Sequence, residues 1–125
     1  MHIVKTHLFT PYGLRSLSSQ DPHYHARYEG NQIERDNAYH NGTVWPWLLG
    51  AFTEALLKTE GFFAKYKTRK FLQACCETLW QHTNTQAGLA CVSEIFDGDI
   101  PHKPRGCIQQ AWSAAELIRM VHLLK

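Results

Sequence analysis

The segment of residues 107–124 constrains the fold most, because it predicts a helix with apolar residues on two of its faces. A helix that is apolar on both sides packs between two layers, which a free-standing four-helix bundle does not require. We therefore predict an all-α chain in which this last helix is an internal element. One face holds Ile108, Ala111, Trp112, Ala115 and Ile118, and the other holds Ala114, Leu117, Val121 and Leu124.

Three earlier segments also predict helices, with a long polar connection after the first. Residues 2–9 have the pattern of a helix end. Thr43 is the expected N-cap of a second helix that stops at Gly61, and a third helix should cover residues 62–82. Residues 10–40 are rich in turn formers, and a connection of this length is a candidate wall of an active site.

The composition fits a piece of one folded domain. With 44% hydrophobic and 19% charged residues among 125, the chain should bury a core, which argues against disorder. The formal charge is +2, and no basic run is long enough to suggest nucleic acid, so we expect no nucleic-acid partner. No apolar stretch approaches the ~20 residues of a membrane helix, and we expect a cytoplasmic protein without a membrane contact.

The cysteines and histidines point to neither disulfides nor a metal. The four cysteines form no C-x-x-C pattern, and we predict four free thiols. His23 and His25 alternate, but no nearby Cys, Asp or Glu completes a known ligand spacing. We therefore predict no metal and no cofactor.

Two motifs about fifty residues apart point to sugar chemistry. Residues 39–47 place two indoles beside a His-Asn-Gly turn, and residues 93–99 place Glu94 in a short apolar turn. The apolar faces of sugar rings stack on aromatic side chains, and cleavage of a glycosidic bond requires a pair of carboxyl groups. Aromatic side chains near a placed carboxylate therefore favour a glycosidase.

Four ordered segments, residues 10–17, 39–47, 93–99 and 104–113, carry a family resemblance. Together they resemble the C-terminal part of bacterial-type glycogen debranching enzymes, the amylo-alpha-1,6-glucosidase domain. The resemblance implies an (α/α)6 barrel, of which this chain would supply about four helices with long loops. Residues 1–125 would then be the C-terminal fragment of a glucosidase catalytic domain. It also implies hydrolysis of α-1,6-linked glucose at glycogen branch points with inversion of configuration.

The resemblance implies that Glu94 is the general base. The family's general acid is an aspartate in an Arg-Asp motif well upstream, so we expect it to precede this chain. Arg35-Asp36 offers the same dipeptide in a different context, and we do not assign Asp36 as the acid. Asp97 and Asp99 fit turn formers, because Asp-Gly is a strong turn signal. We expect Glu94 at the end of a helical hairpin, on the same side as the turn of residues 40–43.

The candidate substrate-binding residues are Tyr12, Arg15, His40, Asn41, Trp45, Trp47, Phe96 and Trp112. Several have two interpretations. Arg15 either edges the pocket or ties the long loop down by an ion pair. His40 and Asn41 at a helix N-terminus either bind sugar hydroxyls or cap the helix. Trp45 and Trp47 would face different directions on a helix, one of them into the core. Trp112 suits a core better than a sugar platform.

Two other functions stay open. The chain could be a non-catalytic helical module that binds oligosaccharide or assembles with a partner, or part of another α/α-barrel glycosidase such as a glucoamylase or trehalase. The segment of residues 39–47 favours debranching over these two enzymes. We expect glycogen or a branched α-glucan oligosaccharide as the partner. We also expect self-association of the fragment, or contact with the missing barrel part, through helix faces left uncovered.

Overall fold

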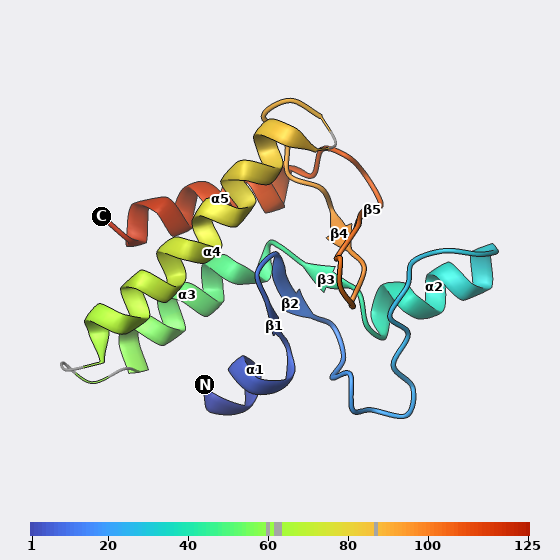
Figure 1. Ribbon diagram of the computed structural model, residues 1–125, viewed down its shortest axis with the longest axis horizontal. Coiled ribbons are helices and arrows are strands. Elements are labelled where there is room, and N and C mark those ends of the chain that lie inside the picture. The colour runs from blue at the N-terminus through green and yellow to red at the C-terminus, as the bar shows by residue number, and fades with distance from the viewer. Residues whose placement is uncertain (60, 62–63, 87) are drawn as a thin grey trace.

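The computed structural model describes residues 1–125 except residues 60, 62–63 and 87 (Figure 1). Its helices are α1 (His2–His7), α2 (Gln32–His40), α3 (Leu48–Thr59), α4 (Lys65–Thr85) and α5 (Ala111–Leu123). Its strands are β1 (Phe9–Thr10), β2 (Gly13–Arg15), β3 (Val44–Trp45), β4 (Ile95–Phe96) and β5 (Pro104–Arg105).

The strands form one antiparallel sheet, and the prediction of an all-α chain belonging to an (α/α)6 barrel is therefore wrong. The sheet has five strands in the order β1-β2-β3-β4-β5. Its centre is set by the pairs Leu14 with Trp45 and Val44 with Phe96. Each strand has only two or three residues, too few to show the alternation by which a strand is recognised in a sequence.

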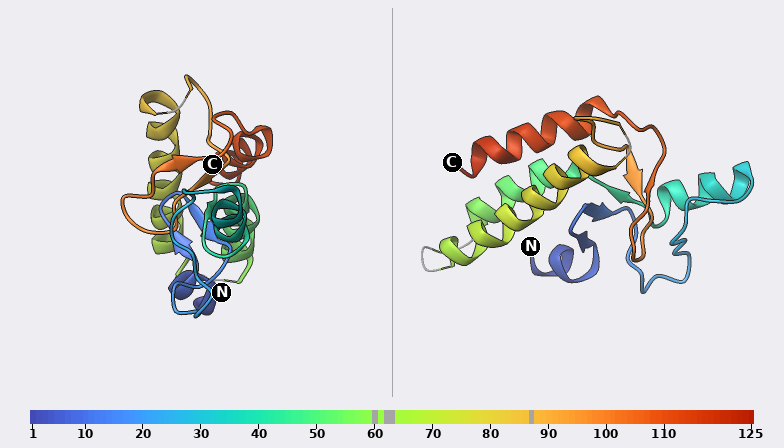
Figure 2. Two further views of the ribbon diagram at one scale, coloured as in Figure 1. Left: turned by 90° about the vertical axis from the view of Figure 1, so that its right-hand side faces the viewer. Right: turned by 45° about the horizontal axis from the view of Figure 1, so that its top comes forward.

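Three helices form a layer on one side of the sheet. Helices α3, α4 and α5 contact one another in all three pairs, and α3 also contacts β2 (Figure 2). Helix α2 projects from the opposite side of the sheet (Figure 1). The core of the layer is made of leucines with one phenylalanine and one methionine: Leu49, Phe52, Leu56, Leu72, Leu79, Leu117 and Met120.

The expectation that both faces of the last helix are buried is wrong. Leu117 and Met120 of α5 are buried against the other helices. Trp112 and Ile118, on the other predicted stripe, are 48% and 68% exposed. Helix α5 therefore covers the layer from one side instead of lying between two layers.

The helix boundaries differ most at the second predicted helix. Thr43 is not its N-cap: the Thr43 hydroxyl donates to the Tyr39 carbonyl at 2.8 Å, at the end of α2. The next residues form β3, and α3 begins at Leu48. The third predicted helix corresponds to α4, although its predicted first residues 62 and 63 lie outside the described part of the chain.

Helix α2 lies inside the segment predicted to be a long connection. Its N-terminus carries a capping box, in which Asn31 accepts from the Glu34 N–H at 3.1 Å and Glu34 accepts from the Asn31 N–H at 2.7 Å. The Asn-x-x-Glu spacing is a helix-start signal that the sequence does contain.

The four cysteines carry free thiols. Among the helices of the described ranges, none combines the length and the apolar composition needed to cross a membrane.

Candidate functional site

The carboxylate of Glu94 lies at the start of the β4–β5 hairpin. The Glu94 N–H donates to the Cys107 carbonyl at 2.9 Å, just beyond the paired residues of the two strands. The Glu94 Oε1 accepts from the Tyr39 hydroxyl at 2.5 Å and from the Gln110 amide at 3.4 Å. The Glu94 Oε2 accepts from the Cys107 N–H at 2.9 Å. Segments around residues 39, 94 and 107–110 thus converge on one half-buried carboxylate.

The backbone of Gly106 packs closely against this carboxylate. A Cβ on Gly106 would lie 2.5 Å from the Glu94 Oε2, and its φ of +67° is one that side-chain-bearing residues rarely adopt. The Pro-Arg-Gly-Cys turn therefore requires glycine at this position. The same turn supplies the Cys107 N–H donor.

Tyr39 joins Glu94 to a cluster of indoles. Its ring packs edge-on against Trp45 with centroids 4.7 Å apart. Trp112 lies 6.3 Å from Trp45 and stacks on Trp47 at 5.4 Å. Burial, the hydrogen bond to Glu94 and the charge of that carboxylate raise the pKa of the Tyr39 phenol above its ordinary range. The phenol is therefore a hydrogen-bond donor at neutral pH.

The indoles line a surface hollow of about 260 Å³, which we call the aromatic hollow. Its lining residues are Ser16, His40, Trp45, Trp47, Leu48 and Trp112. The premise that Trp45 and Trp47 lie on a helix and diverge is wrong. Trp45 ends a strand and Trp47 lies in the turn after it, so both rings reach Trp112 on α5. Trp112 is at the surface rather than in the core.

Three other candidates, Tyr12, Arg15 and Phe96, lie in or contact the segment that follows Glu94. Phe96 is fully buried, and Tyr12 stacks on it at 4.7 Å. The Arg15 guanidinium donates to the Gly98 carbonyl at 2.9 Å, so a hydrogen bond joins Arg15 to the turn that follows β4. None of the three is among the residues that line the aromatic hollow.

His40 and Asn41 lie at a helix C-terminus, not at the N-terminus expected from the sequence. His40 is the last residue of α2 and lines the aromatic hollow. Asn41 is the C-cap, and its side-chain amide donates to the Asn37 carbonyl at 2.9 Å. Asn41 thus has the capping role that the sequence left open.

Asp97 forms a buried charge cluster that sequence reasoning missed. The Arg105 Nε donates to both Asp97 oxygens at 3.1 and 3.2 Å, and its Nη2 donates to Oδ2 at 3.0 Å. The Tyr28 N–H and Arg27 add donors at 3.0 and 3.5 Å. The Asp97 hydrogen bonds raise the pKa of Arg105. The opposite charges on the two arms of the hairpin are the signal that could have predicted this pair.

Asp97 therefore has a structural role, because it is fully buried and forms an ion pair with Arg105. Asp99 is exposed and accepts from the Tyr24 hydroxyl at 2.8 Å, while burial and this bond raise the pKa of Tyr24 to about 12. Tyr39 is the other residue missed from the sequence; its position directly before His40 in the 39–47 motif was the available signal.

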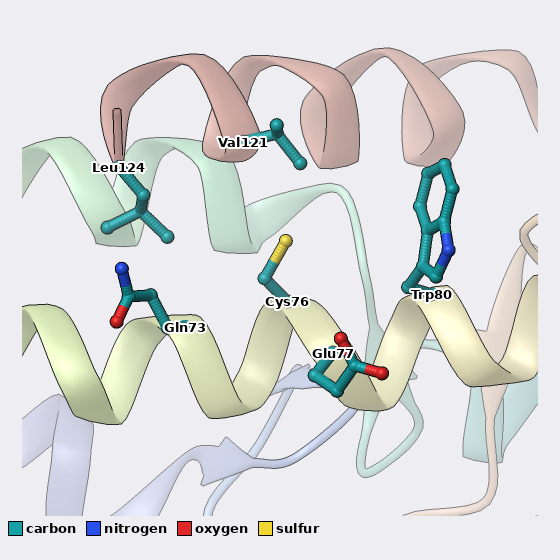
Figure 3. A pocket seen from close by; sticks show the side chains of 6 residues that line it. All are labelled: Gln73, Cys76, Glu77, Trp80, Val121 and Leu124. Carbon is teal, nitrogen blue, oxygen red and sulfur yellow. The ribbon is translucent and has the colours of Figure 1, made fainter.

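A larger hollow, of about 420 Å³, lies between α4 and α5 (Figure 3). The Trp80 indole extends from α4 toward α5, and Val121 points back from α5. It shares no lining residue with the aromatic hollow. Over the described ranges, no group of three or more His, Cys, Asp or Glu residues could hold a metal.

One comparison with known proteins identifies the family. The model of the amylo-alpha-1,6-glucosidase family matches residues 1–119. All four motif segments lie within that match, so the resemblance stated from them is confirmed. Of the helices and strands in the described residues, the match covers every one except the end of α5. This chain therefore belongs to the amylo-alpha-1,6-glucosidase family of glycogen debranching enzymes.

Proposed function

We propose that this chain supplies the general base and the aromatic wall of a glycoside hydrolase site that removes α-1,6-linked glucose at glycogen branch points. One observation carries the proposal. The Tyr39 hydroxyl bonds to Glu94 while its ring packs on Trp45, so the carboxylate and the aromatic hollow are joined through one side chain. Membership of the amylo-alpha-1,6-glucosidase family supports a glucosidase role for these residues.

The role proposed for Glu94 is to take a proton from the attacking water, with inversion of configuration. A base of this kind needs an oxygen that can be reached, and Glu94 is neither sealed in the core nor paired with Lys or Arg within the described residues. In an inverting enzyme about 6.5–9.5 Å separate the two carboxyl groups, which leaves room for the water.

The acid is proposed to come from outside these 125 residues. Asp97 is committed to Arg105, and Asp99 is bound by Tyr24. We propose that the chain is the C-terminal part of a catalytic domain whose acid belongs to the upstream Arg-Asp motif. The four free thiols suit a reducing compartment, and we place the activity in the cytoplasm.

The aromatic hollow is proposed to bind glucose units of glycogen or of a branched α-glucan oligosaccharide. Its volume of about 260 Å³ is slightly below the ~300–1,000 Å³ of pockets for drug-sized ligands, which suits about one sugar ring. Trp45, Trp47 and Trp112 offer faces or edges for stacking, and His40 offers a polar group.

A second candidate is a non-catalytic oligosaccharide-binding module. It is favoured by one observation, namely that Asp97 is unsuited to be the partner of Glu94 because it is buried in ion pairs. The two candidates differ in whether Glu94 is needed for turnover or only for binding.

The test measures glucose release from limit dextrin, which is glycogen trimmed to α-1,6 stubs. The isolated chain should release none. In an enzyme that joins this chain to the upstream acid, Glu94→Gln should lower turnover about 10²–10⁴-fold with substrate binding largely kept, because the amide cannot accept the proton. Asp99→Asn is the matched control, and it should keep turnover. Proton NMR of the wild-type reaction should show β-glucose first.

Unchanged turnover in Glu94→Gln would remove Glu94 from the mechanism. Turnover by the isolated chain that is lost on Glu94→Gln would show that the acid lies within it. If the protein that joins this chain to the upstream acid binds dextrin but releases no glucose, the binding module is favoured.

A further inference from the structure

We infer that Tyr39 is a positioning residue, which holds the Glu94 carboxylate in one orientation with Oε2 toward the reacting water. This inference rests on the proposed function of Glu94 as the base. It starts from the shortest side-chain contact of the site, the 2.5 Å hydrogen bond from the Tyr39 hydroxyl to Oε1.

The two carboxylate oxygens of Glu94 accept different numbers of hydrogen bonds. Oε1 accepts from both Tyr39 and Gln110, whereas Oε2 accepts only from the Cys107 N–H among the described donors. A carboxylate oxygen has two lone pairs, so Oε1 is filled and Oε2 keeps one lone pair for a further donor. Oε2 is therefore the oxygen suited to accept a proton.

Tyr39 can impose this orientation because its own ring is fixed on several sides. Trp45 packs edge-on against it at 4.7 Å, and the Tyr28 ring lies 5.9 Å away. Its backbone carbonyl accepts from the Thr43 hydroxyl at 2.8 Å. A side chain locked by packing and by hydrogen bonds holds the group it contacts more precisely than a free one.

Without the Tyr39 hydroxyl, the weaker Gln110 contact at 3.4 Å would be the remaining described donor to Oε1. The carboxylate could then turn about its last bond. The position of Tyr39 also explains its place in the 39–47 motif, directly before the residues that line the aromatic hollow.

The first test is spectroscopic and uses the 125-residue chain. Tyrosine phenols are titrated by ¹³C NMR in the wild type and in Glu94→Gln. Because the charge of Glu94 contributes to the raised pKa of Tyr39, Glu94→Gln should shift the Tyr39 titration to lower pH. Tyr24 is an internal control, since burial and the hydrogen bond to Asp99, and not Glu94, raise its pKa to about 12. An unchanged Tyr39 titration would overturn the inference.

The second test separates orientation from general binding. Two probes are titrated into the chain: 1-deoxynojirimycin, a glucose analogue with a protonated ring nitrogen, and isomaltose, a neutral α-1,6-linked disaccharide. Tyr39→Phe should weaken the cation about fivefold and isomaltose less than about twofold, because only the cation depends on an oriented charged carboxylate. Tyr24→Phe removes a comparable tyrosine–carboxylate bond elsewhere and should change neither.

Equal weakening of both probes in Tyr39→Phe, or no weakening of either, would contradict a positioning role. If Glu94→Gln weakens the cation while Tyr39→Phe does not, the proposed function stands and the inference about Tyr39 falls. If the wild type binds neither probe, the proposed sugar site on this chain falls, and the phenol titration still decides the role of Tyr39. That titration also decides it if Tyr39→Phe fails to fold, because it leaves Tyr39 intact.

Discussion

The helical layer and the sheet share one apolar core, to which the β4–β5 hairpin adds a buried polar cluster. In the layer of α3, α4 and α5, fully buried leucines such as Leu72 and Leu79 supply the contacts. Around the β4–β5 hairpin, the buried carboxylate of Asp97 accepts hydrogen bonds from Arg105, Arg27 and the Tyr28 N–H. Apolar packing tolerates many arrangements, whereas directed polar contacts fix one, which suits the part of the molecule that must place Glu94.

Besides the shared apolar core, a polar contact joins the helical layer to the segment that precedes β4. His82 of α4 is buried, and its Nε2 accepts from the Ser93 N–H at 3.3 Å, next to Glu94. The other ring nitrogen, Nδ1, lies 3.1 Å from the Gln86 side-chain oxygen. Because the Ser93 N–H can only donate, His82 is neutral with its proton on Nδ1.

The largest effect should come from the helical layer. Leu72→Ala leaves a cavity at a fully buried site and should lower the free energy of unfolding by about 2–5 kcal/mol, as measured by urea denaturation. Ile118→Ala is the control, because Ile118 is exposed on α5 and its truncation should change the free energy by less than about 0.5 kcal/mol. Similar losses in both variants would refute the apolar account of this layer.

A smaller and more local effect is expected at Asp97. The Arg105 side chain is 26% exposed, so Asp97→Asn should cost about 2–3 kcal/mol, less than a fully buried pair. Amide hydrogen exchange should become faster in the β4–β5 hairpin and stay unchanged in the middle of α4. The exposed carboxylate of Asp99 serves as the control through Asp99→Asn. Equal acceleration in α4 would mean that the two regions open as one unit.

The stabilisation that buried His82 provides should depend on pH. Burial lowers the pKa of His82, and the bond to Gln86 opposes that shift only in part. The unfolded chain therefore binds a proton more readily, and the free energy of unfolding should decrease as the pH falls below about 6.5, the ordinary value for histidine. Thermal unfolding between pH 7 and 5 should show a flatter dependence in His82→Gln than in the wild type and in His23→Gln. Parallel curves for the wild type and His82→Gln would show that protonation of His82 does not lower the free energy of unfolding.

Self-association stays a prediction, and the structure narrows where to test it. Tyr66 and Trp80 of α4 and Ile118 of α5 are exposed, so these residues are the ones to substitute in a test of self-association. We expect a dimer or a contact with the rest of the enzyme through these helices. Sedimentation that shows only monomer at micromolar concentration would count against self-association, and Trp80→Ser should weaken any dimer that forms.

The helical layer was the part of the fold most open to prediction from the sequence. Its leucines recur with helical spacing, and α3, α4 and α5 fall within the predicted segments with shifts of a few residues. The centre of the sheet was missed because its pairs join distant residues, as Leu14 joins Trp45 and Val44 joins Phe96. Such short strands gain their hydrogen bonds only once the chain has folded.

The candidate site residues were chosen from motifs and not from geometry, and their roles stay a prediction. The ordered segments pointed to Glu94 and to the indoles, and the family match confirms the resemblance that they carry. Tyr39 and Asp97 were missed as organising residues because their partners, Glu94 and Arg105, are specified by the antiparallel hairpin and the approach of α2. A sequence pattern with helical periodicity contains no information on such contacts.

The most direct test of a shared site for Glu94 and the aromatic hollow uses the four indole N–H signals of the chain in an NMR titration with isomaltose. The signals of Trp45, Trp47 and Trp112, which line the aromatic hollow, should shift together along one binding curve. The signal of Trp80, which lies in the separate hollow between α4 and α5, should stay in place. A titration in which no indole shifts, or in which Trp80 alone responds, would contradict the account.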